Sequence, residues 1–309
     1  MVSCKGIMST KNKEYNPVCI FAYKRPEALY NSLQALEKCK DASKTDLAIY
    51  IDGPKNDSEK DTVKKVLIVA EKFKNANFNS IKISTSPANK GLAKSVIAGV
   101  TEVLTTYNSV IVLEDDLIPT TDFLEYMNLS LDRYEGNKQV GSISGFGFRV
   151  SSNRCYSNYF HKRPTTWGWA TWKDRWEMAV WDLSEENEIL QPAFKSKFNK
   201  GGQDLHRMLI NYLQGNIDSW GIRWAYSHYK NKWLASSPVY SKIINNGYGD
   251  DGTNCNGAIP PPINDGHNQH QSICFVKDIV ESKELSKQVN WYNSNLYKLI
   301  YKIKQWLAV

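Results

Sequence analysis

The chain lacks the features that would place it in several large classes of protein. Its 309 residues contain no apolar run long enough to cross a bilayer. Residues 1–16 are polar and Lys-rich and have no apolar core segment, so no signal peptide is expected. No CxxC pair occurs among the scattered cysteines, which are Cys4, Cys19, Cys39, Cys155, Cys255 and Cys274. We therefore expect a reduced, cytoplasmic protein without a zinc site.

Other features that the sequence lacks exclude some classes of binding partner. The histidines show no metal-ligand spacing and are expected to be structural or surface residues; they are His161, His206, His228, His267 and His270. The basic residues are spread out, with no dense run before the C-terminal segment, so no nucleic acid partner is expected. A net charge of +7 favours anionic partners such as nucleotides or a phospholipid surface.

In the first half of the chain, short apolar runs alternate with segments whose apolar residues recur at helical spacing. The runs predict strands at 17–23, 47–52, 81–84 and 109–113, and the spacing predicts helices at 25–40, 58–74 and from 92 to about 103. This alternation predicts an α/β fold with a mostly parallel, doubly wound sheet flanked by helices. After Phe146 the strands become hard to assign; helices are predicted at 202–214 and 220–231, and a long loop at 245–266.

One of these runs, Val110 to Leu113, leads directly into three carboxylates, Glu114, Asp115 and Asp116. Ligands of open α/β sheets bind at the carboxyl ends of the strands, where these acids would lie. Adjacent carboxylates repel one another, so a metal ion or hydrogen-bond donors are expected beside them. Hard oxygen ligands suit Mg²⁺ or Mn²⁺ shared with phosphates. The alternative is that the acids only cap the helix that begins near Thr120.

Several short motifs accompany this triplet. They are Phe21-Ala-Tyr-Lys-Arg-Pro26, Tyr50-Ile-Asp-Gly53, Asn89-Lys-Gly-Leu-Ala-Lys94, Trp167-Gly-Trp-Ala-Thr-Trp172, Asp218-Ser-Trp-Gly-Ile-Arg-Trp224, Asn246-Gly-Tyr-Gly249 and Gly252-Thr253. In this order and spacing, between Pro17 and Cys255, the set resembles the GT-A glycosyltransferases. It is most similar to the inverting Golgi N-acetylglucosaminyltransferase I group and to related bacterial polysaccharide-cluster (family 2-like) transferases.

The resemblance implies a GT-A (Rossmann-like) domain over residues 17–285. Within it, residues 17–146 would bind the nucleotide sugar and residues 147–285 the acceptor, after a polar extension at 1–16. Asp116 would coordinate Mn²⁺ or Mg²⁺, which would bridge the diphosphate of the donor. Glu114 and Asp115 would contact the ribose or the water shell of the metal.

Residues beside the other strands complete the expected donor site. Arg25 is expected to reach the diphosphate or the base; otherwise it is a solvated charge at a helix start. Asp52 would accept a hydrogen bond from a uracil ring, with a simple turn acid as the alternative. Lys90 and Gly91 lie at a predicted helix N-terminus, which suits anions, although Lys90 is also readily explained as a surface lysine.

Inverting transfer needs a base for the acceptor hydroxyl. Asp218 is the first candidate by resemblance, and an N-cap aspartate is the alternative. Asp251, with Asp250, follows as a candidate on the Gly-rich loop, and Glu177 is a weaker one.

The chain has ten tryptophans, and two of them are assigned to substrate. Trp167 and Trp169 are expected to stack on the sugar, whereas the neighbouring Trp172 and Trp176 are expected in the core.

The C-terminal segment predicts a basic amphipathic helix, placed at 286–309, with its pattern running from Val289. Apolar residues alternate there with Lys298, Lys302 and Lys304. Such a helix can lie on an anionic membrane surface, which would make the protein peripheral at the inner face of the cell membrane. Packing on the domain or on a second subunit is the alternative.

The sequence therefore predicts a metal-dependent inverting glycosyltransferase that moves a hexosyl or N-acetylhexosaminyl group from a UDP-sugar to a carbohydrate or lipid-linked oligosaccharide. One alternative is a sugar-nucleotide nucleotidyltransferase. That class needs a Gly-rich phosphate loop after the first strand, and Phe21 to Pro26 has no glycine. The other alternative is a non-catalytic protein that binds glycans or membrane surfaces.

Overall fold

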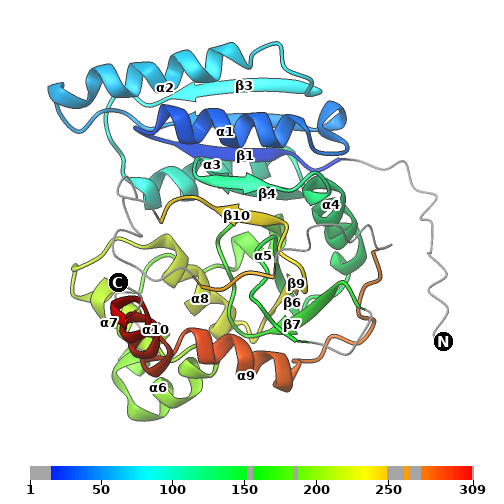
Figure 1. The fold of residues 1–309 in the computed structure, drawn as a ribbon, viewed down its shortest axis with the longest axis vertical. Coiled ribbons are helices and arrows are strands. Elements are labelled where there is room, and N and C mark those ends of the chain that lie inside the picture. The colour runs from blue at the N-terminus through cyan, green and yellow to red at the C-terminus, as the bar shows by residue number, and fades with distance from the viewer. Residues whose placement is uncertain (1–14, 152–155, 184–186, 249–260, 265–272, 308–309) are drawn as a thin grey trace.

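The computed structural model describes residues 15–151, 156–183, 187–248, 261–264 and 273–307. Within these residues one sheet has the strand order β3-β2-β1-β4-β8-β6-β9-β7, and β10 pairs separately with β5 (Figure 1). The strands are β1 (Val18–Ala22), β2 (Asp46–Ile51), β3 (Ser80–Thr85), β4 (Ser109–Glu114), β5 (Leu117–Pro119), β6 (Val140–Ser144), β7 (Asn158–His161), β8 (Trp169–Trp172), β9 (Leu234–Pro238) and β10 (Ile243–Asn245).

The half of the sheet formed by β1 to β4 is parallel throughout. β1 pairs with β2 and β4, and β2 pairs with β3, all in parallel. β8 then runs antiparallel to both β4 and β6, while β6 and β9 are parallel to each other. The predicted α/β fold with a mostly parallel sheet is confirmed. The four predicted strands are all present, and the aromatic second half adds strands that periodicity did not indicate.

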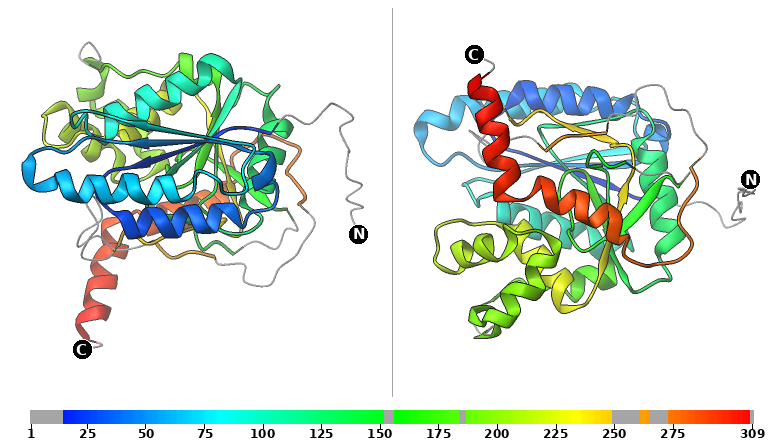
Figure 2. Two further views of the ribbon diagram at one scale, coloured as in Figure 1. Left: turned by 90° about the horizontal axis from the view of Figure 1, so that it is seen from above. Right: turned by 60° about the horizontal axis from the view of Figure 1, so that its bottom comes forward.

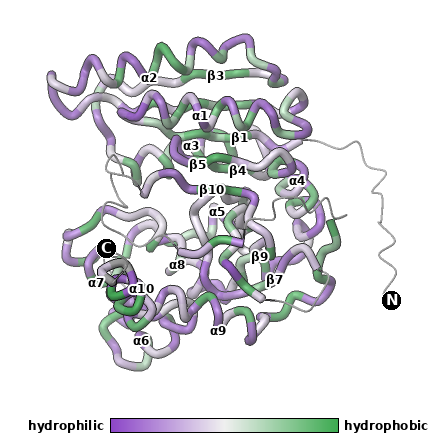
Figure 3. The backbone as a smooth tube through the Cα atoms, in the orientation of Figure 1, coloured by the Kyte–Doolittle hydropathy of each residue, from purple (hydrophilic) through white to green (hydrophobic). Residues whose placement is uncertain are grey.

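Helices cover both faces of the sheet. They are α1 (Pro26–Glu37), α2 (Lys60–Lys72), α3 (Leu92–Thr106), α4 (Phe123–Tyr134), α5 (Lys173–Glu177), α6 (Pro192–Phe198), α7 (Leu205–Leu213), α8 (Trp220–Lys230), α9 (Lys283–Tyr292) and α10 (Asn295–Leu307). Val18 and Ile20 of β1 pack with α1, α2 and α4, whereas Cys19 and Phe21 pack with α3 and α8. The alternation of side chains along a strand thus supplies both hydrophobic layers, and the central strands β1 and β4 are largely hydrophobic (Figure 3).

The C-terminal segment forms two helices where the sequence pattern predicted one. α9 ends at Tyr292, and the hydroxyl oxygen of Ser294 accepts a hydrogen bond of 3.1 Å from the Tyr297 amide in the first turn of α10. Asn293 and Ser294 are residues that bond to nearby backbone and therefore favour helix ends over helix interiors. Figure 2 shows α10 leaving the body of the molecule after this break. None of the described helices is both long and apolar enough to span a bilayer.

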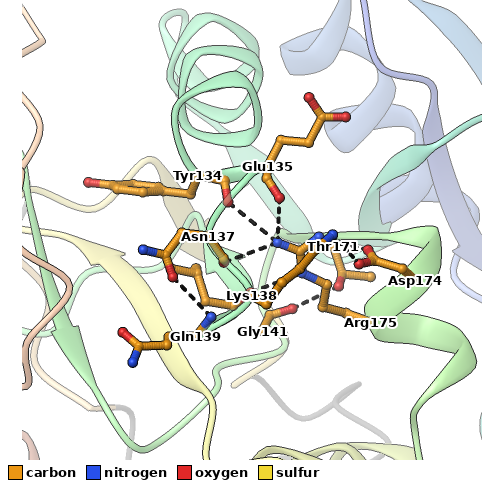
Figure 4. Close-up of polar contacts among 10 residues, drawn as sticks. Tyr134, Glu135, Asn137, Lys138, Gln139, Gly141, Thr171, Asp174 and Arg175 are labelled. Carbon is orange, nitrogen blue, oxygen red and sulfur yellow. Dashed lines mark hydrogen bonds and ion pairs between the residues drawn. The ribbon is translucent and has the colours of Figure 1, made fainter.

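A buried arginine joins α4, β6 and α5. The side chain of Arg175 is 2% exposed, and its Nη2 donates to the carbonyl oxygens of Glu135 (2.6 Å) and Asn137 (3.1 Å) (Figure 4). Its Nη1 bonds Asp174 at 2.7 Å, and its guanidinium lies 4.3 Å from the centre of the Trp172 ring. The carbonyl groups at the end of α4 have no partner within the helix, so Arg175 satisfies them.

Replacing Arg175 by methionine is expected to lower the free energy of unfolding by about 3 kcal/mol, because it removes a buried charged donor from the carbonyls of Glu135 and Asn137 and from Asp174. Urea denaturation measures this change. Lys138→Met removes the exposed partner of the same Asp174 and is the matched control, with an expected change below about 0.5 kcal/mol. Equal losses in the two variants would contradict the role assigned to Arg175.

Candidate active site

The three predicted carboxylates lie at the carboxyl edge of the parallel strands. Glu114 ends β4, and the Asp115 amide donates a 3.0 Å hydrogen bond to the Phe21 carbonyl at the end of β1. Because β1, β2 and β4 are parallel, the residues that follow them meet at this edge, including Arg25 and Asp52. The fold therefore brings together three segments that are far apart in the sequence.

Arg25 clamps two of the acids. Its Nη1 lies 2.8 Å from Asp116 Oδ2, and its Nη2 forms an ion pair with Asp115 Oδ1. The side chains of Arg25, Asp115 and Asp116 are only 19%, 4% and 14% exposed. Arg25 immediately precedes Pro26, the first residue of α1, so the start of that helix sets its position. Such charge-assisted bonds are stronger than neutral ones.

The acids are electrostatically unequal. Burial, together with the charges of Asp116 and Asp115, raises the pKa of Glu114 to about 8. Burial also raises the pKa of Asp115 to about 6, although Arg25 acts to lower it. Glu114 is therefore mainly protonated near neutral pH, and Arg25 offsets one of the two negative charges on Asp115 and Asp116.

A second strand pair holds Asp116 from the other side. β5 begins directly after it and pairs antiparallel with β10, and the Asn246 amide donates to the Asp116 carbonyl at 3.0 Å. A Cβ added at Gly247 would lie 2.1 Å from Asp116 Oδ2. Any larger residue at this position would have to displace this carboxylate from its place beside Arg25. Asn246 and Gly247 belong to a motif noted in the sequence, but only the β5–β10 pairing assigns them to the acid edge.

Asp52 is fully engaged by the chain itself. Its Oδ1 accepts from the amides of Gly53 and Lys90, and its Oδ2 from the Gly91 amide and Asn89 Nδ2, all at 2.9–3.0 Å. These four bonds match the four acceptor sites of a carboxylate. Asp52 thus ties the turn after β2 to the start of α3. The predicted bond from Asp52 to a uracil ring stays a prediction, and it requires one of these donors to move.

Lys90 and Gly91 lie at a helix N-terminus, as predicted, because α3 begins at Leu92. Gly91 has φ +80°, a conformation that favours glycine. The anion that their amides bind in this structure is the Asp52 carboxylate. The side chain of Lys90 is exposed.

Asp218 lies beside the start of α3. Its Oδ2 would be 4.0 Å from a Cβ added at Gly91, and its Oδ1 pairs with Arg223 Nη2 at 3.2 Å. The Asp218 side chain is 61% exposed. It is not the N-cap of α8, because the hydroxyl of Ser219 accepts the Ile222 amide in that position. The structure therefore brings Asp218 to the start of α3 and leaves one of its oxygens without a bond to Arg223.

Other candidate bases lie elsewhere. Glu177 follows β8, whose Trp172 pairs with Ser109 at the start of β4, so Glu177 belongs to the edge opposite Glu114. Its assignment as a weaker base is wrong for this reason. Asp250 and Asp251 lie outside the described residues.

The two tryptophans that were assigned to the sugar lie in different environments. Trp169 is 0% exposed and packs on Trp176, Trp220 and Trp224, so its predicted place in the sugar pocket is wrong. Spacing alone did not reveal that β8 is buried on both faces. Trp167 is partly exposed and packs edge-on against Tyr248, with ring centres 5.7 Å apart. Tyr248 follows Gly247, so Trp167 lies toward the acid edge.

Asp116 is the carboxylate best suited to a metal. No group of three His, Cys, Asp or Glu side chains in the described parts of the chain could hold an ion without help. Asp116 nevertheless has a hard oxygen donor in a space that Gly247 keeps open, which fits a cation shared with a phosphorylated ligand. Arg25 now supplies the positive charge there.

Open cavities occur away from this edge. One of about 320 Å³ is lined by Gln203, Lys287, Asn290, Trp291, Ser294 and Leu296. Another of about 390 Å³ involves Arg149, Tyr240 and Gln288. Both lie along α9, and neither is lined by the acids.

No protein-family model matches this chain, and no curated protein does. Solved structures with a similar fold include TarS 1–349 from S. aureus, at 12% identity and a TM-score of 0.45, covering 75% of this chain and 61% of that one. The structure of the same fragment in complex with UDP is 13% identical, with a TM-score of 0.41, and the match covers 74% of this chain and 59% of that one. The mannosyltransferase PcManGT from Pyrobaculum calidifontis, in complex with GDP-Man and Mn²⁺, is 10% identical, with a TM-score of 0.39, and the match covers 71% of this chain and 70% of that one.

The chain thus spans about three fifths of the TarS fragment. At these identities the likeness is one of fold alone.

The raised pKa values of Glu114 and Asp115 predict a pH dependence of stability. The folded protein keeps protons that the unfolded chain loses near the ordinary pKa values of 3.8 and 4.5. The stability that these two groups contribute is therefore largest at low pH and is lost as pH rises from about 4 to about 6 for Asp115 and to about 8 for Glu114. Each group contributes a slope of at most about 1.4 kcal/mol per pH unit. Urea denaturation between pH 5.5 and 8.5 measures it. Glu114→Gln should flatten the upper part of this dependence, and an unchanged slope in that variant would refute the assignment.

Proposed function

We propose that this chain is a metal-dependent, inverting glycosyltransferase. It would move a hexosyl or N-acetylhexosaminyl group from a nucleoside diphosphate sugar, in the first instance a UDP-sugar, to a carbohydrate hydroxyl. Two observations carry the proposal: the ion pair of Arg25 with Asp116 at the carboxyl edge of the parallel strands, and the position of Asp218 beside Gly91 at the start of α3. This edge is where α/β sheets bind their ligands.

The donor half of the proposal rests on the acids and on Arg25. Mn²⁺ or Mg²⁺ held by Asp116 would neutralise charge on the departing diphosphate. The guanidinium of Arg25 has the planar shape that binds phosphate oxygens in pairs, and it already lies at this edge. We propose that Arg25 turns from Asp115 and Asp116 toward the diphosphate when the donor binds. Glu114 and Asp115 remain candidates for the ribose.

The acceptor half rests on Asp218. Its Oδ1 is held by Arg223, while its Oδ2 is the oxygen nearest Gly91. In the proposed step Asp218 takes the proton of the acceptor hydroxyl, the hydroxyl oxygen bonds to the anomeric carbon, and the sugar–phosphate bond breaks with the electron pair leaving on the diphosphate. Attack opposite the leaving group inverts the anomeric configuration. Trp167 is the aromatic residue that would stack on a sugar ring.

One observation favours a second candidate, a non-catalytic protein that binds glycans. Arg25 occupies both Asp115 and Asp116, which is also how a fixed structural ion pair looks. The two candidates differ in whether nucleotide and metal bind together at Asp116.

Thermal shift against UDP and GDP, each with and without Mn²⁺, tests the donor site. We expect one nucleotide to raise the melting temperature only when Mn²⁺ is present, because the ion and diphosphate bind jointly. Asp116→Asn should abolish the shift. Gly247→Ala should reduce it, because its Cβ displaces the Asp116 carboxylate. Gly136→Ala, where a Cβ meets nothing within 4 Å, is the control. No shift with any nucleotide would favour the non-catalytic candidate.

Asp218→Asn is expected to keep the metal-dependent nucleotide shift and to lose transfer by at least about a hundredfold, because only the proton acceptor is removed. Release of nucleoside diphosphate from a panel of nucleotide sugars and glycan acceptors measures transfer. Asp57→Asn alters a carboxylate that is 92% exposed and serves as the control. Full activity of Asp218→Asn would remove this residue from the mechanism.

A further inference from the structure

The helix α10 exposes an apolar stripe that nothing in the described structure covers. Leu296, Leu299, Ile303 and Trp306 are 53%, 57%, 47% and 79% exposed. Their spacing places them on one face of the helix, over about 15 Å of its length. Exposed apolar residues are ordinary when scattered, but a continuous row of them marks an interaction surface.

Most of the stripe lies away from the packed side of α10, while Leu296 at its start also lines the cavity formed with Gln203 and α9. Tyr297 lies edge-on against Tyr292 of α9 at 5.2 Å between ring centres, and Tyr301 follows at 6.3 Å from Tyr297. α9 itself is anchored, since its Leu285 and Val289 are 5% and 1% exposed in a core cluster with Phe146. α10 therefore follows an anchored helix, and the left view of Figure 2 shows it projecting from the molecule.

The charge beside the stripe selects the kind of partner. The helix carries Lys298, Lys302 and Lys304, and no acidic residue lies between Asn295 and Leu307. Lys298 has only a distant contact of 4.0 Å with Asp204, and Lys302 and Lys304 are exposed. Pairing two copies through this stripe would bring these lysines together without carboxylates from α10 to neutralise them. An anionic lipid surface offers both the apolar layer and the opposite charge.

We propose that α10 docks on an anionic membrane surface, with Leu296, Leu299, Ile303 and Trp306 in the boundary layer and the lysines at the lipid headgroups. Trp306 fits this layer because indole rings favour the boundary between headgroups and acyl chains. The helix lies in the plane of the surface and does not cross it. The inference is independent of the proposed chemistry, since it uses no residue of the acid edge. It would bring the enzyme to lipid-linked acceptors.

Flotation of the full chain with vesicles tests the proposal. One set contains phosphatidylcholine alone, and the other contains phosphatidylcholine and phosphatidylglycerol in equal parts. We expect binding to the anionic vesicles that weakens as salt is raised, because lysines carry part of the attraction. The double change of Leu299 and Ile303 to Glu should weaken binding at least about tenfold, and Lys302→Glu with Lys304→Glu should act in the same direction.

The control is Ile68→Glu, which alters a 49% exposed apolar residue on α2 and should leave binding unchanged. Circular dichroism confirms that the variants fold, and the nucleotide-dependent thermal shift is measured in parallel, so loss of vesicle binding is separable from loss of the donor site. Equal binding to both vesicle types, or no binding, would overturn the proposal. A wild-type dimer in light scattering that Leu299→Glu dissociates would instead assign the stripe to a second copy.

Discussion

Three consecutive carboxylates at the end of a buried strand cannot all stay charged in a dry environment unless a cation accompanies them. In this protein that cation is Arg25. Its guanidinium is fixed by the start of α1 and reaches Asp115 and Asp116, while Glu114 meets the remaining repulsion through a raised pKa. At this edge, the ends of β1 and β4 and the start of α1 are held together by the ion pairs of Arg25 with Asp115 and Asp116.

The sequence predicted the structure well where the burial of a continuous hydrophobic face was the dominant interaction. The strands β1 to β4 and the helices between them follow from apolar runs and helical spacing, because each buries a continuous hydrophobic face. The order of the parallel strands then places Arg25, Asp52 and Glu114 at one edge. These elements are local in the sequence or obey simple rules of α/β topology.

The second half of the chain was harder to predict, because its contacts are long-range. The short strand β8 is buried on both faces, so Trp169 carries no signal that separates it from Trp167. Gly247 approaches Asp116 only because β10 pairs with β5, a contact between residues far apart in the sequence. The break between α9 and α10 depended on the capping chemistry of Ser294, which a continuous amphipathic pattern conceals.

The four hydrogen bonds of Asp52 also bear on the entropy of ligand binding. They make the turn after β2 and the segment before α3 a single unit, already fixed in the absence of any substrate. A ligand bound beside Gly91 would therefore contact a surface that is already ordered. Its affinity would not be lowered by the entropy cost of ordering two loops. In this part of the site, selectivity would come from shape, and the adaptable element would be the side chain of Arg25.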